Sequence, residues 1–298
     1  MDISFFFDRQ LRYAESFRTT FNALKNSLLR EINFEGFKYV LQLNPLRIKS
    51  STADISKPLD REKCFLCKAN MPPYQLGMDF DENFTIFVNP FPIFSRHFTI
   101  VSRRHTPQTI AGNVMTMLEA ARELEGLVVF YNSPKSGASA PFHCHFQAGG
   151  FDEMPLFYDL ENLVKLYKVS ENDGVVKVDD TTRRFLIVKE QDVSEAEKKI
   201  KRILDTLNSL YGMTEPEANI GAVYRGGFFC VVILPREKHR PFEYSLPEDE
   251  RILVSPGFAD LAGMVPCSLK SDFEKITKEN IKSIMSQVTI TEEKFIKI

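Results

Sequence analysis

Two of the chain's five histidines lie in one short segment, H-C-H-F-Q, which places His143, His145 and Gln147 at alternate positions. On a β-strand this spacing points all three side chains to the same face. A neutral imidazole there can attack a phosphoryl centre and form a covalent phosphoramidate, which divides one difficult transfer into two easier steps. A pair of hydrogen-bonded histidines on a core strand is the alternative interpretation.

The residues before this motif are suited to holding phosphate oxygens. The apolar run at 127–131 predicts a buried strand, and a loop rich in Ser, Gly and Pro follows it. The backbone N–H groups and hydroxyls of such loops bind anions. We expect substrate contacts from five residues of this loop: Asn132, Lys135, Ser136, Gly137 and Ser139.

Loop and motif together resemble the nucleotidyltransferase branch of the histidine-triad superfamily, which carries H-x-H-x-Q where the hydrolase branch has a third histidine. That branch includes galactose-1-phosphate uridylyltransferase, diadenosine tetraphosphate phosphorylase and GDP-L-galactose phosphorylase. The S-G-A-S element is similar to the diadenosine phosphorylases, and the H-F-Q-A ending is similar to the GDP-galactose enzymes. The resemblance implies that His145 is the nucleophile and that Gln147 hydrogen-bonds the α-phosphate.

The resemblance also implies a double displacement. His145 attacks the α-phosphate of a nucleotide or sugar-nucleotide donor, and phosphate or a sugar phosphate then removes the nucleotidyl group. A backbone carbonyl near the loop is expected to orient the imidazole. Two alternatives stay open: a histidine-triad hydrolase, against which Gln147 argues, and a nucleotide-binding protein without catalysis. Phe142 and Cys144 stand where the uridylyltransferase has prolines, so specificity for a sugar nucleotide is open.

Cys64 and Cys67 form a C-F-L-C pair. Outside a disulfide framework this spacing is more often a metal half-site or a redox pair than a staple. A structural zinc needs four ligands, and the chain has no second C-x-x-C, so histidines must complete the set. The resemblance implies that His105 and His143 do so. Two reduced thiols without metal, or a redox pair, are the alternatives.

Two strands, 84–88 and 97–102, are predicted on either side of a proline-broken loop. This stretch resembles the superfamily's nucleotide-pocket segment, which implies that Asn89 contacts the ribose and that the next two residues wall the base. We interpret His97 as a structural histidine that caps the loop rather than as a catalytic acid.

The periodicity of the first half predicts the strand–strand–helix–strand order of a histidine-triad half-barrel. The helix before the catalytic strand would have Thr106 as its N-cap and Pro107 at its first position. The other predicted elements are a helix at 8–31, a strand at 34–43 and the helix itself at 107–125.

The chain continues beyond Gly150, where a minimal histidine-triad protein would end. Ser194 and Glu197 predict a capping box at the start of a long helix, and Gly212 its end. The predicted elements are helices at 156–169, 194–211 and 272–287, strands at 175–178 and 185–189, and a hairpin at 220–234 turning at Gly226-Gly227. By analogy with larger family members, this layout resembles a second, degenerate copy of the fold without H-x-H.

Two further loops carry cationic side chains. The loop P-R-E-K-H-R-P contains Arg236, Lys238 and His239, which we expect to hold the phosphates of the acceptor. Arg47 and Lys49 are candidates for contact with an anionic ligand. A solvated loop is the alternative at both places. The small-residue segment 255–263 predicts tight packing or a phosphate-facing turn.

Composition excludes several classes of protein. The 298 residues are 43% hydrophobic and 26% charged, as expected of a soluble globular protein. A net charge of -2 argues against nucleic-acid binding, and no apolar run is long enough to cross a membrane. The start of the chain lacks the layout of a signal peptide, and five cysteines do not suggest a secreted disulfide framework, so we predict a cytoplasmic protein.

The sequence therefore predicts an α+β fold of two histidine-triad-like antiparallel half-barrels flanked by helices. Residues 1–150 would form the catalytic half, with an N-terminal helix and the zinc-type half-site, and residues 151–298 the degenerate second half. Family members include monomers and dimers, so the resemblance leaves a homodimer open.

Overall fold

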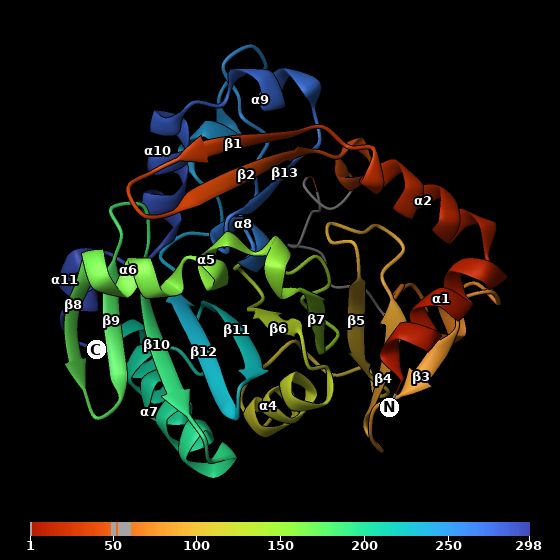
Figure 1. The fold of residues 1–298 in the computed structure, drawn as a ribbon, viewed down its shortest axis with the longest axis horizontal. Helices are drawn as coiled ribbons and strands as arrows, with labels where there is room; N and C mark the ends of the chain where they lie inside the picture. The colour runs from red at the N-terminus through yellow and green to blue at the C-terminus, as the bar shows by residue number, and fades with distance from the viewer. Residues whose placement is uncertain (1, 49–51, 53–60) are drawn as a thin grey trace.

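A ten-stranded sheet crosses the molecule and carries the H-C-H-F-Q motif near its centre (Figure 1). The structure is a computed structural model that describes residues 2–48, 52 and 61–298, so that Lys49 lies outside the described residues. The strands, in sheet order, are β3 (Gly77–Asp79), β4 (Phe84–Val88), β5 (His97–Ser102), β7 (His145–Gly150), β6 (Leu127–Asn132), β11 (Ala218–Arg225), β12 (Phe228–Pro235), β10 (Arg184–Glu190), β9 (Val175–Asp179) and β8 (Lys168–Asn172).

The sheet contains the same topology twice. In the first half the strands run in the order 3-4-5-7-6, and in the second half, from the opposite edge, in the order 8-9-10-12-11. A helix follows the third strand of each half: α4 (Val114–Glu123) and α7 (Val193–Tyr211). The halves join where β6 pairs antiparallel with β11, with Asn132 opposite Asn219. The predicted duplicated α+β half-barrel is confirmed.

Both faces of the sheet are covered. The side chains of Val129 and Tyr131 pack with α4, α7 and the N-terminal helices, whereas those of Val128 and Phe130 pack on the opposite side. A strand buried on both faces needs apolar residues at every position, which explains the continuous run at 127–131. No helix among the described residues is long and apolar enough to span a membrane.

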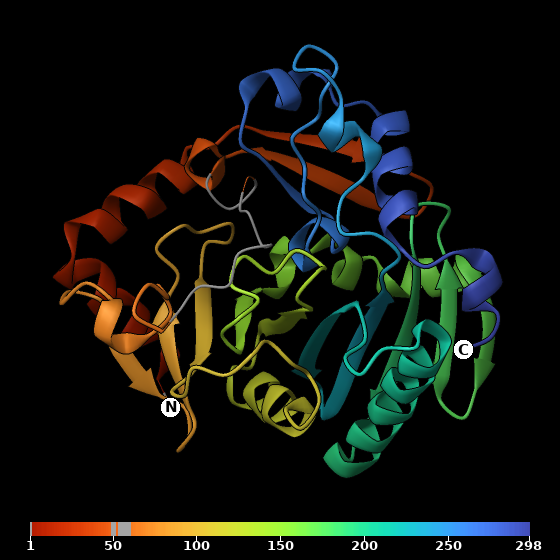
Figure 2. The same cartoon turned by 180° about the vertical axis from the view of Figure 1, so that it is seen from behind.

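A second, three-stranded sheet lies over the face that carries His145, and it pairs a hairpin from the first fifty residues with a strand from the last forty (Figure 2). Its strands are β1 (Leu29–Asn33), β2 (Lys38–Leu43) and β13 (Met264–Cys267), with β13 parallel to β2. The remaining elements on this side are α5 (Pro155–Tyr158), α6 (Leu160–Tyr167), α8 (Phe258–Leu261), α9 (Lys270–Lys275) and α10 (Lys278–Val288), whereas the buried Phe295 of α11 (Glu292–Phe295) packs in the core of the opposite face.

The N-terminal segment differs from the single predicted helix at 8–31. It forms α1 (Ile3–Tyr13) and α2 (Glu15–Lys25), which are separated by the extended backbone of Ala14. The residues after α2 pair with β2 in a hairpin instead of continuing the helix. The apolar spacing fitted a helix, but hairpin pairing with the next strand along the chain decided the conformation of residues 29–33.

The predicted start of the helix before the catalytic strand was wrong, because α4 begins at Val114. Gly112 has a φ of +78°, which interrupts a helix, and the backbone before it pairs elsewhere. Cys144 N donates to Thr106 O, and Gln108 N donates to Pro141 O. This stretch therefore supports the catalytic loop, and Thr106 is not a helix cap.

The second half shows similar local differences. The predicted helix at 156–169 is divided into α5, α6 and strand β8, and the predicted helix at 272–287 is divided into α9 and α10, which Thr277 caps. Asp192, not Ser194, caps α7 by accepting from the N–H groups of the next residues. Gly212 ends α7 with a φ of +62°, as predicted, and the β11–β12 hairpin turns at the predicted glycines.

Candidate active site

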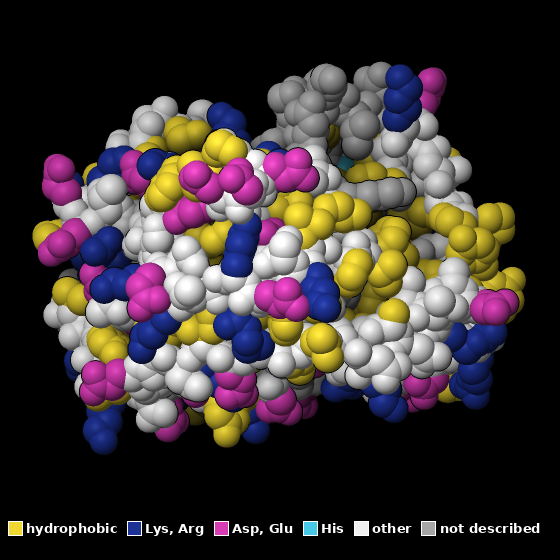
Figure 3. Space-filling model, turned by 90° about the horizontal axis from the view of Figure 1, so that it is seen from above, with side chains coloured by type: hydrophobic (Ala, Val, Ile, Leu, Met, Phe, Trp, Pro, Cys, Tyr) yellow, Lys and Arg dark blue, Asp and Glu magenta, His cyan; other side chains and the backbone are white. Residues whose placement is uncertain are grey.

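A cavity of about 560 Å³ lies between the His145 face of the large sheet and the elements α8 and β13. This volume is within the range of ~300–1,000 Å³ that is usual for small-molecule sites. Apolar side chains gather around a hollow on the face that carries the three-stranded sheet (Figure 3). The large sheet contributes Thr99, Phe130, Asn132, His145 and Gln147 to the lining.

The imidazole of His145 is held in one tautomer by its own chain. Its Nδ1 lies 2.8 Å from the carbonyl oxygen of His143, which only accepts, so Nδ1 carries the proton and Nε2 has the free lone pair. Burial, with a smaller effect of the neighbouring His143, lowers the pKa of His145 to about 4, so the ring is neutral at pH 7. The predicted carbonyl that orients the imidazole is therefore confirmed.

Gln108 fixes the backbone of His145. Its Oε1 accepts from His145 N (2.8 Å), and its Nε2 donates to the carbonyls of Asn132 (2.9 Å) and His145 (3.0 Å). The side chain thereby joins the end of β6 to the start of β7. Nothing in the sequence marks this glutamine, because it lies alone in a segment with a helical pattern.

His97 determines how the amide of Gln147 points. Ile93 N donates to Nδ1 of His97 across the 89–97 loop (3.1 Å), so His97 caps this loop as predicted. Nε2 then carries the ring proton and donates to Oε1 of Gln147 (3.0 Å). The amide NH₂ group of Gln147, which lines the cavity, is left as a donor.

Asn89 also lines the cavity. Its Oδ1 accepts from Phe91 N (2.9 Å), and its Nδ2 donates to Thr99 Oγ1 (3.1 Å). Asn89 thus holds the loop of Pro90 and Phe91 against the sheet, and both of these residues line the same cavity.

The structure divides the predicted phosphate loop into two groups. Gly137 and Ser139 line the cavity together with Asn132. Lys135 N and Ser136 Oγ instead donate to Glu217 Oε2, at 3.1 and 2.7 Å, and neither residue lines the cavity.

The second half of the chain holds this loop in place. Asn132 Oδ1 accepts from Asn219 Nδ2 (2.6 Å) and from Phe258 N (2.7 Å). Asn219 Oδ1 accepts in turn from Arg236 (2.6 Å). The buried chain Arg236–Asn219–Asn132 therefore links the residue that follows β12 to the last residue of β6.

Arg236 has no donor left for a substrate phosphate. All five of its N–H groups donate to protein acceptors, whose distances lie between 2.6 and 3.1 Å. Burial lowers its pKa to about 10. The expectation that Arg236 contacts the phosphates of an acceptor is corrected: Arg236 positions the loop. Its acceptors are Asn219 Oδ1 and the carbonyls of Val288, Pro256, Lys238 and His239.

The other two cationic candidates of this loop differ from each other. Lys238 is exposed and does not line the cavity, whereas His239 does. His239 Nδ1 lies 3.0 Å from the carbonyl of Lys135, so it donates, and Nε2 is buried without a hydrogen-bond partner among the described residues. The sequence did not indicate which side chain of this loop would reach the cavity.

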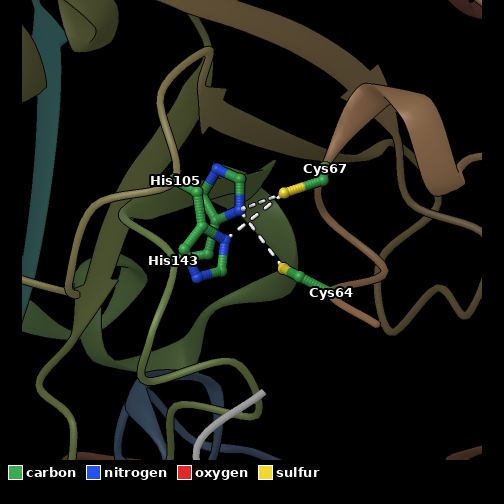
Figure 4. A group of neighbouring side chains, drawn as sticks. All are labelled: Cys64, Cys67, His105 and His143. Carbon is green, nitrogen blue, oxygen red and sulfur yellow. Dashed lines mark hydrogen bonds between the residues drawn. The ribbon is translucent and has the colours of Figure 1, made fainter. Parts of the chain in front are cut away.

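A second cluster lies beside the nucleophile. The ligand atoms of Cys64, Cys67, His105 and His143 all lie within 4.8 Å of one another, so the predicted four residues do form a group that can hold a metal ion. Figure 4 shows the two cysteines on one loop, facing the two histidines from separate segments. Tetrahedral Cys₂His₂ sets are typical of structural zinc.

The tautomer of His143 fits metal binding. Its Nε2 lies 2.7 Å from Ser102 O and donates to it, so Nδ1 is unprotonated, and Nδ1 faces Cys64 Sγ at 3.2 Å. Such a carbonyl partner is the usual support of a metal-bound histidine. His143 precedes β7 and does not line the cavity, so the prediction that its side chain shares a face with His145 was wrong.

Comparison with known proteins agrees with this architecture. The crystal structure of yeast Ap4A phosphorylase Apa2 superposes with a TM-score of 0.59 at 15% identity, over 93% of this chain and 94% of that one. Its complex with Ap4A gives 0.59 at 13% identity, over 93% and 96%. The predicted resemblance to the nucleotidyltransferase branch of the histidine-triad superfamily is confirmed at the level of the fold.

Two other comparisons say less about the fold or the function of this chain. An ADP-glucose phosphorylase from Arabidopsis thaliana covers 89% of this chain and 100% of its own at 13% identity, with a TM-score of 0.41 that is too low to support an argument. The family described as a domain of unknown function, DUF4922, matches residues 6–150. No curated protein sequence matches the chain.

Proposed function

We propose that the chain is a nucleotidyltransferase or phosphorylase that works through a nucleotidyl-histidine on His145. The observation that carries the proposal is the arrangement on β7: a neutral imidazole with Nε2 free, and beside it the amide of Gln147 with its NH₂ group left as a donor. The yeast relative is an Ap4A phosphorylase that has been solved with AMP and with Ap4A, which supports a nucleotide as the substrate.

In the first step the Nε2 lone pair of His145 bonds to the α-phosphorus, and the bond to the bridging oxygen breaks. The leaving group departs with that oxygen and its electron pair. The proton stays on Nδ1 and is donated in a hydrogen bond to the carbonyl oxygen of His143, which stabilises the positive ring. Gln147 and the donors near Gly137 and Ser139 act on the phosphoryl oxygens as charge builds up.

In the second step an acceptor, phosphate or a sugar phosphate, attacks the same phosphorus, and the P–N bond breaks. His145 returns to its neutral form. Asn89 would contact the ribose of the nucleotide, and His239 would contact the second substrate.

We further propose that the metal of the four-residue cluster is zinc and that its role is structural. It would tie the loop of Cys64 to the segment that positions His145, and four protein ligands leave no open position for water. Thiolate ligands need a reducing compartment, which supports the cytoplasm.

The division of labour between the halves is also part of the proposal. Residues 1–150 carry the nucleophile and the metal ligands. In residues 151–298, β12 takes the sheet position of β7 and contains no histidine, which supports a degenerate second copy.

Covalent capture tests the mechanism. The protein is mixed with nucleotide donors labelled at the α-phosphate, and binding of each nucleotide is measured separately by calorimetry. We expect an acid-labile, alkali-stable adduct that is absent from His145→Ala. If nucleotides bind but none of the donors leaves label on the protein, the proposal is contradicted. Label that decays equally fast with and without an acceptor favours the hydrolase.

A further inference from the structure

The lining of the cavity changes in chemistry from one end to the other. Figure 1 shows α2 and β4 on the same side of the molecule, while α8 lies near the centre beneath the three-stranded sheet. The side chains from α2, β4 and the metal loop are mainly aromatic or apolar: Phe17, Phe65, Met71, Tyr74 and Phe87. The loops near β2, β12 and α8 contribute the apolar Leu46, Phe258 and Ala259, and they also supply a group of charged or polar side chains, called the polar end below: Arg47, His239, Arg240, Ser255 and Asp260.

Asp260 is an unusual residue for such a wall. Its side chain lies on α8 and is only 8% exposed, yet it lines the cavity and forms no salt bridge with another described residue. Gly257 N donates to its Oδ2 (2.9 Å), which leaves acceptor capacity on the other oxygen. Burial raises the pKa of Asp260 to about 6, although Gly257 and the charge of Arg47 lower it, so the group is mainly ionised at pH 7.

A cap for α8 is the simplest explanation of this carboxylate. A cap needs only one acceptor oxygen, however, and a neutral asparagine would supply it without burying a charge. Burying a charged group without a partner is costly, so a retained carboxylate at a cavity wall indicates a ligand that donates to it.

His239 also offers an acceptor. Its Nδ1–H already donates to Lys135 O, so Nε2 is a lone pair, and it has no partner among the described residues. Burial, together with the charge of Arg240, lowers the pKa of His239 to about 4, so the ring stays neutral and Nε2 does not become a donor at pH 7.

Arg47 supplies the complementary donor. One of its terminal nitrogens donates to Phe91 O (3.0 Å), while its buried Nε has no partner among the described residues. The polar end therefore combines two free acceptors with one free donor.

Arg47 and Arg240 could attract a phosphate, but a bare phosphate chain only accepts hydrogen bonds, so it would leave the acceptors on Asp260 and His239 without donors and would be repelled by the carboxylate. It suits hydroxyl groups, each of which donates to one atom and accepts from another. A second nucleobase would find its stacking partners at the opposite, aromatic end.

We propose that the polar end is a glycosyl subsite, in which Asp260 and His239 accept hydrogen bonds from sugar hydroxyls and Arg47 donates to a sugar or phosphate oxygen. The inference rests on the proposed function and narrows it: the donor is a nucleoside diphosphate sugar rather than a dinucleoside polyphosphate. In the first step the bond between the α-phosphorus and the bridging oxygen breaks, and a sugar 1-phosphate leaves with that oxygen.

The test compares single-turnover labelling of His145 by two donor classes that carry the same base, nucleoside diphosphate sugars and dinucleoside tetraphosphates. Wild-type protein should be labelled at least tenfold faster by one of the sugar nucleotides. Asp260→Asn, which keeps the acceptor for Gly257 N, should lower kcat/KM for that donor by about ten- to hundredfold, as expected for loss of a hydrogen bond to a charged group. Its labelling by the dinucleoside compound should change less than twofold.

Two further variants complete the design. Asp192→Asn alters a capping carboxylate on α7, away from the cavity, and should label like wild type. His239→Asn keeps a donor for Lys135 O, removes the Nε2 acceptor and should show the same selective loss as Asp260→Asn, which keeps the inference testable if Asp260→Asn does not fold.

The outcomes separate the two proposals. The glycosyl subsite is overturned if the dinucleoside tetraphosphates label the wild-type protein as fast as the sugar nucleotides or faster. It is also overturned if both variants lose labelling rate equally with both donor classes. Either result leaves the nucleotidyl-histidine in place. Absence of label with every donor overturns the proposed function, and the subsite with it.

Discussion

The proposed nucleophile, His145, is held in place by uncharged groups. His145 donates to a backbone carbonyl, and Gln147 accepts from a neutral His97 whose pKa burial lowers to about 3. A chain of fixed tautomers therefore determines which atoms face the cavity, and no carboxylate takes part in these hydrogen bonds. The catalytic face can then meet an anionic phosphate without a repelling charge beside it.

Replacing Gln147 with Glu should remove the N–H donor that faces the cavity without destabilising the fold. Nε2–H of His97 can donate to a carboxylate as well as to an amide, so the thermal midpoint should change little. The cavity loses an N–H donor, and we expect labelling of His145 to fall by about 10²–10³-fold, as for loss of an oxyanion-hole donor. Single-turnover labelling and thermal unfolding measure the two effects. An unchanged labelling rate would show that Gln147 does not contact the reacting phosphate.

Asp260 should reduce stability at neutral pH. Its pKa is raised from the ordinary value of 3.8 to about 6 in the folded chain, so the folded state binds more protons between those values, and its stability falls as the pH rises through that window. Asp260→Asn removes this penalty. We expect its free energy of unfolding to exceed that of wild type by on the order of 2 kcal/mol above pH 6, with the gain vanishing by about pH 4.

Denaturant titrations of both proteins between pH 4 and 8 measure this difference. A variant that is less stable than wild type at every pH would mean that Asp260 is mainly a structural cap. A gain in stability combined with a loss of activity is the pattern expected of a functional residue.

At the scale of elements, the loop after β6 depends on close contact with the segment before α8. Gly137 has a φ of +91°, and a Cβ added there would lie 2.5 Å from the Cα of Gly257. Ser136 on one side of it is held by Glu217, and Asn132 is held by Asn219. Most of the partners that shape the catalytic loop therefore come from the second half of the chain.

Gly137→Ala tests this contact, and the chain contains a matched control. Gly226 also has a positive φ, +59°, but an added Cβ there meets nothing within 4 Å. Gly226→Ala should cost only the backbone strain, about 1 kcal/mol, and keep activity. Gly137→Ala adds a clash with backbone and should cost about 2–4 kcal/mol in total, together with a loss of labelling at His145. Equal effects of the two variants on stability and labelling would contradict the proposed close packing.

At the scale of the molecule, the two topological copies do not form separate bodies. The large sheet is continuous through β6 and β11, and the small sheet pairs β2 near the N-terminus with β13 near the C-terminus. The cavity lies where these connections meet, so its walls come from both halves.

Metal removal should affect the whole site. We expect one zinc per chain by mass spectrometry, and dialysis against a chelator should lower the thermal midpoint and the rate of His145 labelling, because the metal loop contributes cavity wall. Cys64→Ser should bind less zinc and reproduce both losses. Cys230→Ser, at a half-buried cysteine on β12 outside the cluster, should retain metal and activity. A metal-free protein with unchanged stability would exclude a structural role.

Features that depend on near neighbours in the chain could be predicted from sequence. Backbone geometry and burial act locally on four such features: the alternation at β7, the apolar run of β6, the glycine at the end of α7 and the glycines in the β11–β12 turn. The four candidate metal ligands come from three separate segments of the chain, but their identity follows from the chemistry of the donor set together with a family pattern, and the structure brings them together.

Only the tertiary structure decided three other features: the division of the N-terminal helix, the start of α4 and the roles of individual polar side chains. Ser136, Arg236 and Asp260 each have several chemically sensible partners: solvent, substrate or a distant part of the chain. Ser136 donates a hydrogen bond to Glu217, Arg236 donates mainly to backbone carbonyls, and Asp260 lines the cavity. Local sequence cannot rank such partners, because the free energy that decides between them comes from burial and from hydrogen bonds between segments more than 50 residues apart.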